Sequence, residues 1–252
     1  TDIKVYRGSA RLGIETDTLD IWGKTLNTRP VEDVNMSKLE EAVTNFSGVI
    51  TQTPPMYSAL KVKGKKLYEY AREGKEVDVK SRKIFVERAE IISFDGSEFE
   101  FEIACSKGTY IRSICADIGK ALGCGAAMSS LIRTKSGCFE LSDSVDIEKL
   151  QVMTGEDIEA LLLPIDMPLP HLGRAEVSDW EKHLFINGVE LRKNQWLELE
   201  KPRFANEEFP LPIRKEFTQL YRVYDRAGDF LGTAIENKGL IKADKVFYNA
   251  NI

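Results

Sequence analysis

The sequence predicts an α+β fold, with a largely antiparallel mixed sheet and flanking helices followed by a small, mostly-β module at the C-terminus. The first observation is the alternation of apolar and polar residues from Glu98 to Cys105, which indicates a strand with one buried face. The second is a β-rich run at 84–94 that ends at Asp95-Gly96, a strong hairpin signal, so the two strands should pair antiparallel. The third is a change to helical spacing of the apolar residues after Cys105.

A first amphipathic helix is predicted upstream of this hairpin. The apolar residues from Leu39 to Phe46 follow i, i+3, i+4, i+7 spacing, which is typical of a helix with one buried face. Ser37 and Glu40 predict a capping box at its start, and Gly48 predicts its end.

A second helix is predicted from Ile111 to Leu122, ended by Gly123. The stretch CSKGTYIRSIC, Cys105 to Cys115, therefore contains a strand-to-helix junction. Backbone N–H groups at the start of a helix have no partner within the helix, so such a junction favours anions.

Prolines mark the expected boundary between two domains. Pro164, Pro168 and Pro170 fall within 158–173, where neither a helix nor a central strand accepts them easily. We expect a catalytic domain at 1–169 and a second domain at 174–252. In the latter, two β-rich runs in 220–236 flank a turn at 227–229.

The composition is that of a cytoplasmic globular protein. The chain has 252 residues, of which 42% are hydrophobic, and no apolar run approaches the roughly 20 residues that a transmembrane helix needs. Its four cysteines include no CxxC pair and there are only two histidines, so we expect reduced, mostly buried thiols and no metal. The net charge is −5, yet 61–83 holds nine Lys/Arg against four Asp/Glu, which makes this segment basic.

Four motifs, in order, resemble the bacterial tRNA pseudouridine synthase B (TruB) family. KVYRGSARLGIETDTLDIWG is similar to its KxY segment followed by LGxxTDTxDxxG, and PPMYSALKVKGKKLYEYAREG to its PPxYSAxKxxGxxxYxxAR segment. CSKGTYIRSICADIGKALGCGA resembles its CSKGTYIR…LGCGA block, and LIRTKSGCFEL its LxRTxSGxF block. The resemblance implies a pseudouridine-synthase-type fold and isomerisation of uridine 55 in the T loop of tRNA by base flipping, with no metal or organic cofactor.

The resemblance also implies roles for individual residues. Arg112 would pair with the nucleophilic Asp and keep that carboxylate ionised and oriented. Tyr6 would stack on the flipped base, while Tyr110 and Leu131 would contact the target nucleotide. Taken singly, each of these residues has an ordinary structural explanation as a packing or surface group.

The resemblance further implies that a basic insertion at about 54–84 contacts the RNA outside the pocket that binds the flipped base. The candidate backbone contacts are Lys61, Lys63, Lys65, Lys66 and Arg133. The segment 174–252 resembles a PUA-type RNA-binding module, best at YRVYDRAGDFLGTAIE. The expected partner is a tRNA T-arm stem-loop bound by a monomer.

The nucleophile itself is expected outside the sequence. In the family it lies in a GTLDP block that precedes the KxY segment, whereas this sequence starts at Thr1, just before KxY. We therefore expect the natural beginning to be missing and the 252-residue chain alone to be inactive. The DTLDI stretch lacks the flanking Gly and Pro of GTLDP, so Asp17 and Asp20 are expected to organise a surface turn.

Two other functions remain open on the sequence. An RNA-binding or tRNA-folding protein without chemistry fits the same basic segment. A hydrolase of small glycosides or nucleosides would use Asp17 and Asp20 together with Tyr110 in one pocket.

Overall fold

A computed structural model describes residues 3–203 and 218–247. The chain forms two compact units, Thr1–Ser144 and Val145–Ile252, which are called the N-terminal and C-terminal units below. The domain limits expected at 169 and 174 stay a prediction. The α+β architecture with a smaller, mostly-β second part is confirmed.

The N-terminal unit is built on one antiparallel sheet. Its strands, in spatial order, are β10 (Phe139–Glu140), β9 (Ala126–Ser136), β1 (Lys4–Leu12), β8 (Glu98–Cys105), β7 (Arg82–Phe94) and β4 (Gly48–Gln52). The predicted hairpin is confirmed: β7 and β8 pair antiparallel, and Asp95 accepts hydrogen bonds from the Ser97 and Glu98 amides in the turn between them.

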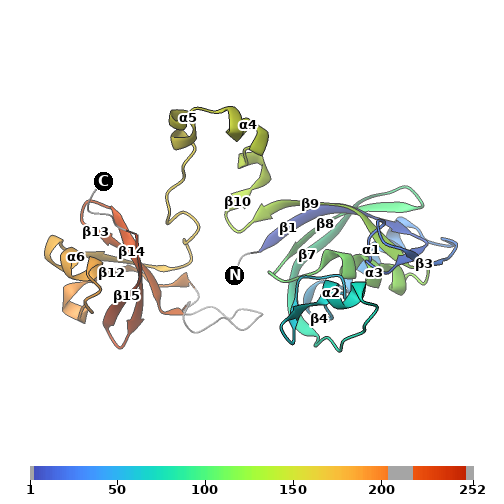
Figure 1. Ribbon diagram of the computed structural model, residues 1–252, viewed down its shortest axis with the longest axis horizontal. Coiled ribbons are helices and arrows are strands. Elements are labelled where there is room, and N and C mark those ends of the chain that lie inside the picture. The colour runs from blue at the N-terminus through green and yellow to red at the C-terminus, as the bar shows by residue number, and fades with distance from the viewer. Residues whose placement is uncertain (1–2, 204–217, 248–252) are drawn as a thin grey trace. The chain divides into compact units, whose positions relative to one another are not determined.

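One face of this sheet carries the core and the other carries charge. Helices α1 (Met36–Thr44) and α3 (Ile111–Ala121) both pack on the inner face (Figure 1), where the alternating residues of β8 are buried. On the opposite face, Arg7 pairs with Glu100 and Arg88 pairs with Glu102 across neighbouring strands. The alternation read from the sequence therefore assigned the two faces of β8 correctly.

The helix predicted over 39–46 exists, but its predicted cap is wrong. α1 begins at Met36, and the side chain of Asn35 accepts a hydrogen bond from the Lys38 amide as the N-cap. Ser37 lies inside the first turn rather than at the cap. Asn is as good an N-cap as Ser, so the sequence offered two starts two residues apart, and the chain uses the earlier one.

Two small hairpins complete the N-terminal unit. β2 (Ile14–Thr16) pairs with β3 (Thr25–Thr28), and β5 (Lys61–Val62) pairs with β6 (Lys65–Lys66) just before α2 (Leu67–Arg72). The second hairpin and α2 belong to the basic segment that leaves the sheet after β4 and returns at β7. A short 3₁₀ helix, η1 (Leu141–Asp143), follows β10.

The C-terminal unit begins with two short helices, α4 (Ile147–Val152) and α5 (Gly155–Ala160), neither of which contains a buried residue. Its sheet has the order β12 (Leu197–Glu200), β11 (Gly173–Val177), β13 (Leu220–Asp225), β14 (Phe230–Asn237) and β15 (Leu240–Val246). β11 and β13 are parallel, whereas the other pairs are antiparallel. Phe185 from α6 (Asp179–Ile186) fills its core, and η2 (Lys193–Gln195) precedes β12. The two predicted β-rich runs are thus β13 and β14.

Within the described ranges, no helix has both the length and the apolar character needed to cross a bilayer.

Candidate active site

The junction between β8 and α3 is held in place by several local contacts. The Ser106 hydroxyl accepts a hydrogen bond from the Phe85 amide at 3.0 Å, and the Ser106 amide donates to the Phe85 carbonyl at 2.7 Å. The Thr109 hydroxyl donates to the Ser106 carbonyl at 2.9 Å, which closes the turn. Gly108 has a φ of 86°, in the left-handed region that favours glycine. The residues SKGTY therefore form a rigid turn that is fastened to β7.

Tyr110 is the residue where the turn becomes a helix. It is the N-cap of α3, with an extended backbone (φ −100°, ψ 106°). Its amide donates to Gln52 Oε1 at 2.8 Å, and its carbonyl accepts from Gln52 Nε2 at 3.0 Å. The Arg82 guanidinium lies over its ring, 5.1 Å from the centroid. Both the backbone and the ring of Tyr110 are thus held by other parts of the chain.

Arg112, in the first turn of α3, hydrogen-bonds to the turn between β2 and β3 and to the segment after β4. Its Nη1 donates to the Thr18 carbonyl at 2.9 Å and to Asp20 Oδ2 at 3.0 Å, and its Nη2 donates to the Tyr57 carbonyl at 2.8 Å. The side chain is 24% exposed, so water only partly screens these bonds. Sequence reasoning expected an Asp partner for Arg112 but did not identify Asp20.

Asp17 and Asp20 organise the turn between β2 and β3, as predicted. Asp17 accepts hydrogen bonds from the Lys24 amide at 2.8 Å and from the Tyr57 hydroxyl at 3.2 Å. Asp20 Oδ1 accepts from the Thr18 hydroxyl at 2.7 Å and from the Trp22 amide at 3.2 Å, while its Oδ2 accepts from Arg112. Burial, followed by the neighbouring Asp17 carboxylate, raises the pKa of the Tyr57 hydroxyl. The two carboxylates are occupied by this network rather than paired with each other, which does not favour the hydrolase alternative.

Tyr6 and Leu131 lie on neighbouring strands in the middle of the sheet. Tyr6 in β1 is opposite Arg133 in β9, and Gly8 is opposite Leu131. Directly opposite residues share a face, as do residues two apart on one strand, so Tyr6, Leu131 and Arg133 share a face of the sheet. Tyr6 packs against the core, whereas Leu131 is 37% exposed. A side chain at Gly8 would collide with the Ser130 carbonyl, so glycine keeps the two strands close beside Tyr6.

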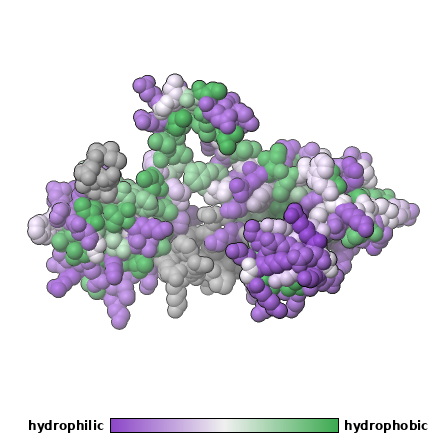
Figure 2. Space-filling model, viewed as in Figure 1, coloured by the Kyte–Doolittle hydropathy of each residue, from purple (hydrophilic) through white to green (hydrophobic). Residues whose placement is uncertain are grey.

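The predicted phosphate-binding lysines fall into two groups. Lys65 pairs with Glu73 and lies 4.9 Å from the centroid of the Tyr70 ring, while Lys66 lies 5.5 Å from that of Tyr68. Lys61 and Lys63 are exposed. Figure 2 shows hydrophilic residues gathered over α2 and the loops around it. Within the basic segment, Lys65 and Lys66 therefore contact other residues of the segment, whereas Lys61 and Lys63 are exposed to solvent.

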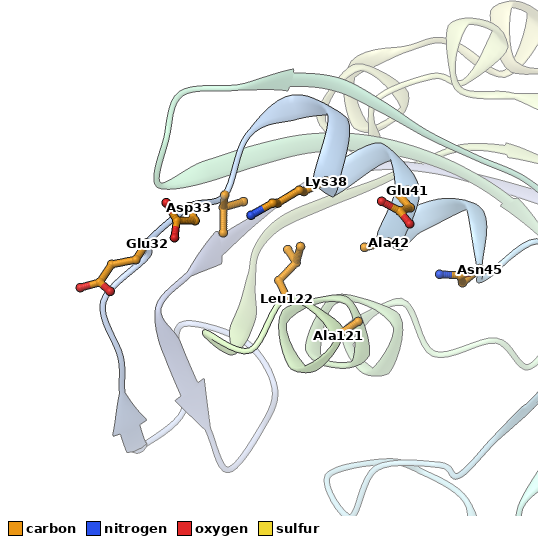
Figure 3. A pocket seen from close by; sticks show the side chains of 9 residues that line it. Glu32, Asp33, Lys38, Glu41, Ala42, Asn45, Ala121 and Leu122 are labelled. Carbon is orange, nitrogen blue, oxygen red and sulfur yellow. The ribbon is translucent and has the colours of Figure 1, made fainter.

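The pocket drawn in Figure 3 is a different feature. It has a volume of about 420 Å³ and lies between α1 and the end of α3, with Lys38, Glu41 and Asn45 facing Ala121 and Leu122. Glu32 and Asp33 line its outer end. None of the sequence-predicted site residues lines it, and its carboxylates outnumber its single lysine, which disfavours a phosphate-bearing ligand.

The cysteines agree with the expectation of mostly buried thiols. Cys105, Cys115 and Cys124 are buried, whereas Cys138 is exposed, and all four are free. In the part of the chain that the structure describes, no group of three or more His, Cys, Asp or Glu is placed to hold a metal ion.

Two family models match the chain. Residues 1–111 match the N-terminal domain of the TruB family pseudouridylate synthases, and residues 112–170 match the tRNA pseudouridylate synthase B C-terminal domain.

Relatives match over most of the chain. A tRNA pseudouridine synthase B of Alkaliphilus oremlandii is 42% identical over 215 residues, which are 85% of this chain and 70% of that protein. One of Clostridium novyi is 39% identical over 97% of this chain and 78% of its own length. One of Chromobacterium violaceum is 44% identical over 76% of this chain, which spans 62% of that protein.

Solved structures show the same fold. The chain aligns with one in a crystal structure of a Cbf5-Nop10-Gar1 complex at a TM-score of 0.67 and 21% identity, over 98% of this chain and 67% of the other. A chain in a structure of an H/ACA RNP bound to a substrate RNA aligns at a TM-score of 0.66 and 19% identity, over 99% and 67%.

Proposed function

Because this chain belongs to the TruB family of pseudouridylate synthases, we propose that it isomerises uridine to pseudouridine in tRNA, at position 55 of the T loop. The observation that carries the proposal is the match to a tRNA pseudouridine synthase B over 97% of the chain. We propose a T-arm stem-loop as the minimal substrate, with the protein acting as a monomer in the cytoplasm.

The reaction moves the glycosidic bond of the uracil ring from N1 to C5. The N1–C1′ bond breaks, a C5–C1′ bond forms, C5 loses a proton and N1 gains one, so atoms and electrons balance without a cofactor. A uridine within a folded loop must be extruded first, at a cost of a few kcal/mol. Stacking on an aromatic side chain returns about 1–3 kcal/mol per base, which is the role we assign to Tyr6.

Tyr110, Leu131 and Arg112 complete the proposed base site. Tyr110 and Leu131 contact the extruded nucleotide, and Arg112 orients the attacking carboxylate. Its hydrogen bonds to Thr18 and Tyr57 support this role, because they fix the direction of the guanidinium.

Asp20 is not assigned as the nucleophile. Its two oxygens already accept hydrogen bonds from the Thr18 hydroxyl, the Trp22 amide and Arg112. Attack would require these bonds to be given up, so we assign to Asp20 the positioning of Arg112. The expectation that an Asp of a GTLDP block attacks the nucleotide remains a proposal.

The exposed Lys61 and Lys63 are the proposed phosphate contacts of the insertion, and Arg133, opposite Tyr6, is proposed to contact RNA beside the base site. Each lost contact to a single strand should reduce the slope of log K against log salt by roughly 0.7. Lys61→Gln with Lys63→Gln should therefore flatten the salt dependence more than Lys65→Gln, because Lys65 is engaged by Glu73.

Release of tritium from a stem-loop carrying uridine labelled at C5 tests the reaction, because the C5 proton is lost only when the ring rejoins through carbon. We expect release by the product of the complete open reading frame and none when the target uridine is replaced by cytidine. Binding of the stem-loop without release would favour the non-catalytic RNA-binding alternative. Release by the 252-residue chain itself would contradict a nucleophile outside these residues.

A further inference from the structure

Gln52 and Arg82 are opposite each other on the ladder between β4 and β7. Gln52 is the last residue of β4 and Arg82 the first of β7, so the whole basic segment leaves and rejoins the sheet at this one step. Both side chains reach Tyr110, which is 58 residues from Gln52. The residue proposed to contact the target nucleotide is therefore held by the two residues that anchor the insertion.

Gln52 holds the backbone of Tyr110. It is only 3% exposed, and its amide oxygen and nitrogen bind the Tyr110 N–H and C=O at 2.8 and 3.0 Å. A carboxamide is the one side-chain group that offers both a donor and an acceptor in this arrangement. The two bonds leave the Tyr110 peptide little freedom to rotate.

Arg82 holds the ring of Tyr110 and the turn before it. Its guanidinium lies 5.1 Å from the ring centroid, and its Nη2 donates to the Gly108 carbonyl. A Cβ at position 108 would lie 3.3 Å from the Arg82 guanidinium carbon, so glycine also makes room for this contact. A planar guanidinium can stack on the ring and donate to the carbonyl together, which an ammonium does less well.

We propose that Gln52 and Arg82 are positioning residues that set the orientation of Tyr110 for the isomerisation. This inference rests on the proposed function. Neither residue needs to touch the RNA: Gln52 is buried, and Arg82 acts through the ring and through Gly108. The pair therefore governs the rate of the step on bound RNA rather than the affinity for RNA.

Four variants test the pair. Gln52→Glu keeps the acceptor for the Tyr110 amide but replaces the donor to its carbonyl by an oxygen. Arg82→Gln removes the stacked cation, whereas Arg82→Lys restores the charge without the planar fork. Arg88→Lys is the matched control, because Arg88 lies on the same strand with its side chain 47% exposed and pairs with Glu90 and Glu102 instead of with Tyr110 or Gly108 among the described residues.

Kinetics and affinity give the first readout. In the product of the complete open reading frame, single-turnover tritium release at saturating stem-loop should fall about 10- to 100-fold in Gln52→Glu and Arg82→Gln, with partial recovery in Arg82→Lys. The dissociation constant of the stem-loop, at fixed salt, should change less than about threefold because phosphate contacts remain. Weaker binding with an unchanged rate would overturn the proposal and make Arg82 an RNA contact.

The second readout does not depend on activity. The ¹⁹F resonance of 3-fluorotyrosine at position 110, assigned by its loss in Tyr110→Phe, should shift in Gln52→Glu and Arg82→Gln but not in Arg88→Lys. Melting temperatures identify any variant that has merely unfolded. An unmoved resonance in folded variants would overturn the positioning role. Resonances that shift in the variants, together with no tritium release by the wild-type protein, would overturn only the proposed function.

Discussion

Arg112 and Asp20 are 92 residues apart in the chain, yet Nη1 of the arginine donates to Oδ2 of the aspartate at 3.0 Å. The bond joins the first turn of α3 to the turn between β2 and β3. The same guanidinium binds the Tyr57 carbonyl, so one side chain connects the helix, the turn and the start of the basic insertion.

Asp20→Asn should weaken this connection and lower the free energy of unfolding by about 1.5–3 kcal/mol, the range for hydrogen bonds to charged groups. A double-mutant cycle with Arg112→Met, followed by urea unfolding, should give a coupling of about 1 kcal/mol or more. The matched control is Arg7 with Glu100, whose side chains are 56% and 45% exposed and should couple weakly. Equal coupling in the two pairs would contradict a special role for the Arg112 network.

Gly119→Ala should destabilise the N-terminal unit. Gly119 lies in α3, and a Cβ there would collide with the backbone nitrogen of Ala126 in β9. Overpacking of this kind costs about 1–3 kcal/mol, because the helix must move away from the sheet. Gly155→Ala is the matched control: its Cβ would meet nothing within 4 Å in α5, so helix propensity should make it neutral or slightly stabilising. Thermal unfolding of both variants checks the difference.

The Lys182–Asp225 pair should make the C-terminal unit sensitive to acid. Burial opposes ionisation of Asp225, but the Lys182 ammonium at 2.6 Å and the Asp229 and Ala227 amides outweigh it and lower its pKa. A carboxyl with a lowered pKa stabilises the fold at pH values above its unfolded pKa of about 3.9. That stabilisation is lost as the pH falls from about 4 through the folded pKa.

Lys182→Met should reduce stability at pH 7 by about 1–3 kcal/mol and make the loss of stability below about pH 4 smaller, because the Asp225 carboxylate loses its cation and its folded pKa rises toward the unfolded value. Urea unfolding followed at Trp196 fluorescence between pH 3 and 7 measures both effects. A variant whose stability falls with the same pH profile as the wild type would refute the linkage to Asp225.

One cysteine should react rapidly in the native protein. Cys138 is exposed, whereas burial raises the pKa of the Cys105 and Cys115 thiols and denies the reagent access. Titration with a thiol-specific disulfide reagent should count one fast thiol in the native state and four after denaturation. Cys138→Ser should abolish the fast phase, and a fast phase that survives this change would contradict the burial of the other three.

Local patterns in the sequence identified the elements near the site. The alternation in 98–105, the Asp95-Gly96 turn and the helical spacing after Cys105 each depend on neighbours within a few residues, and β7, β8 and α3 follow them. The cap of α1 was missed because Asn35 and Ser37 are both good N-caps, and local sequence alone does not distinguish them.

The fold class, the family and the residue types of the site could be predicted without coordinates, because they follow from periodicity and from contiguous motifs. The partners of those residues became known from the folded chain: Asp20 contacts Arg112, and Gln52 and Arg82 contact Tyr110. Such contacts depend on strand register and on how a helix end meets a distant turn, and a one-residue change of register would turn each side chain to the opposite face.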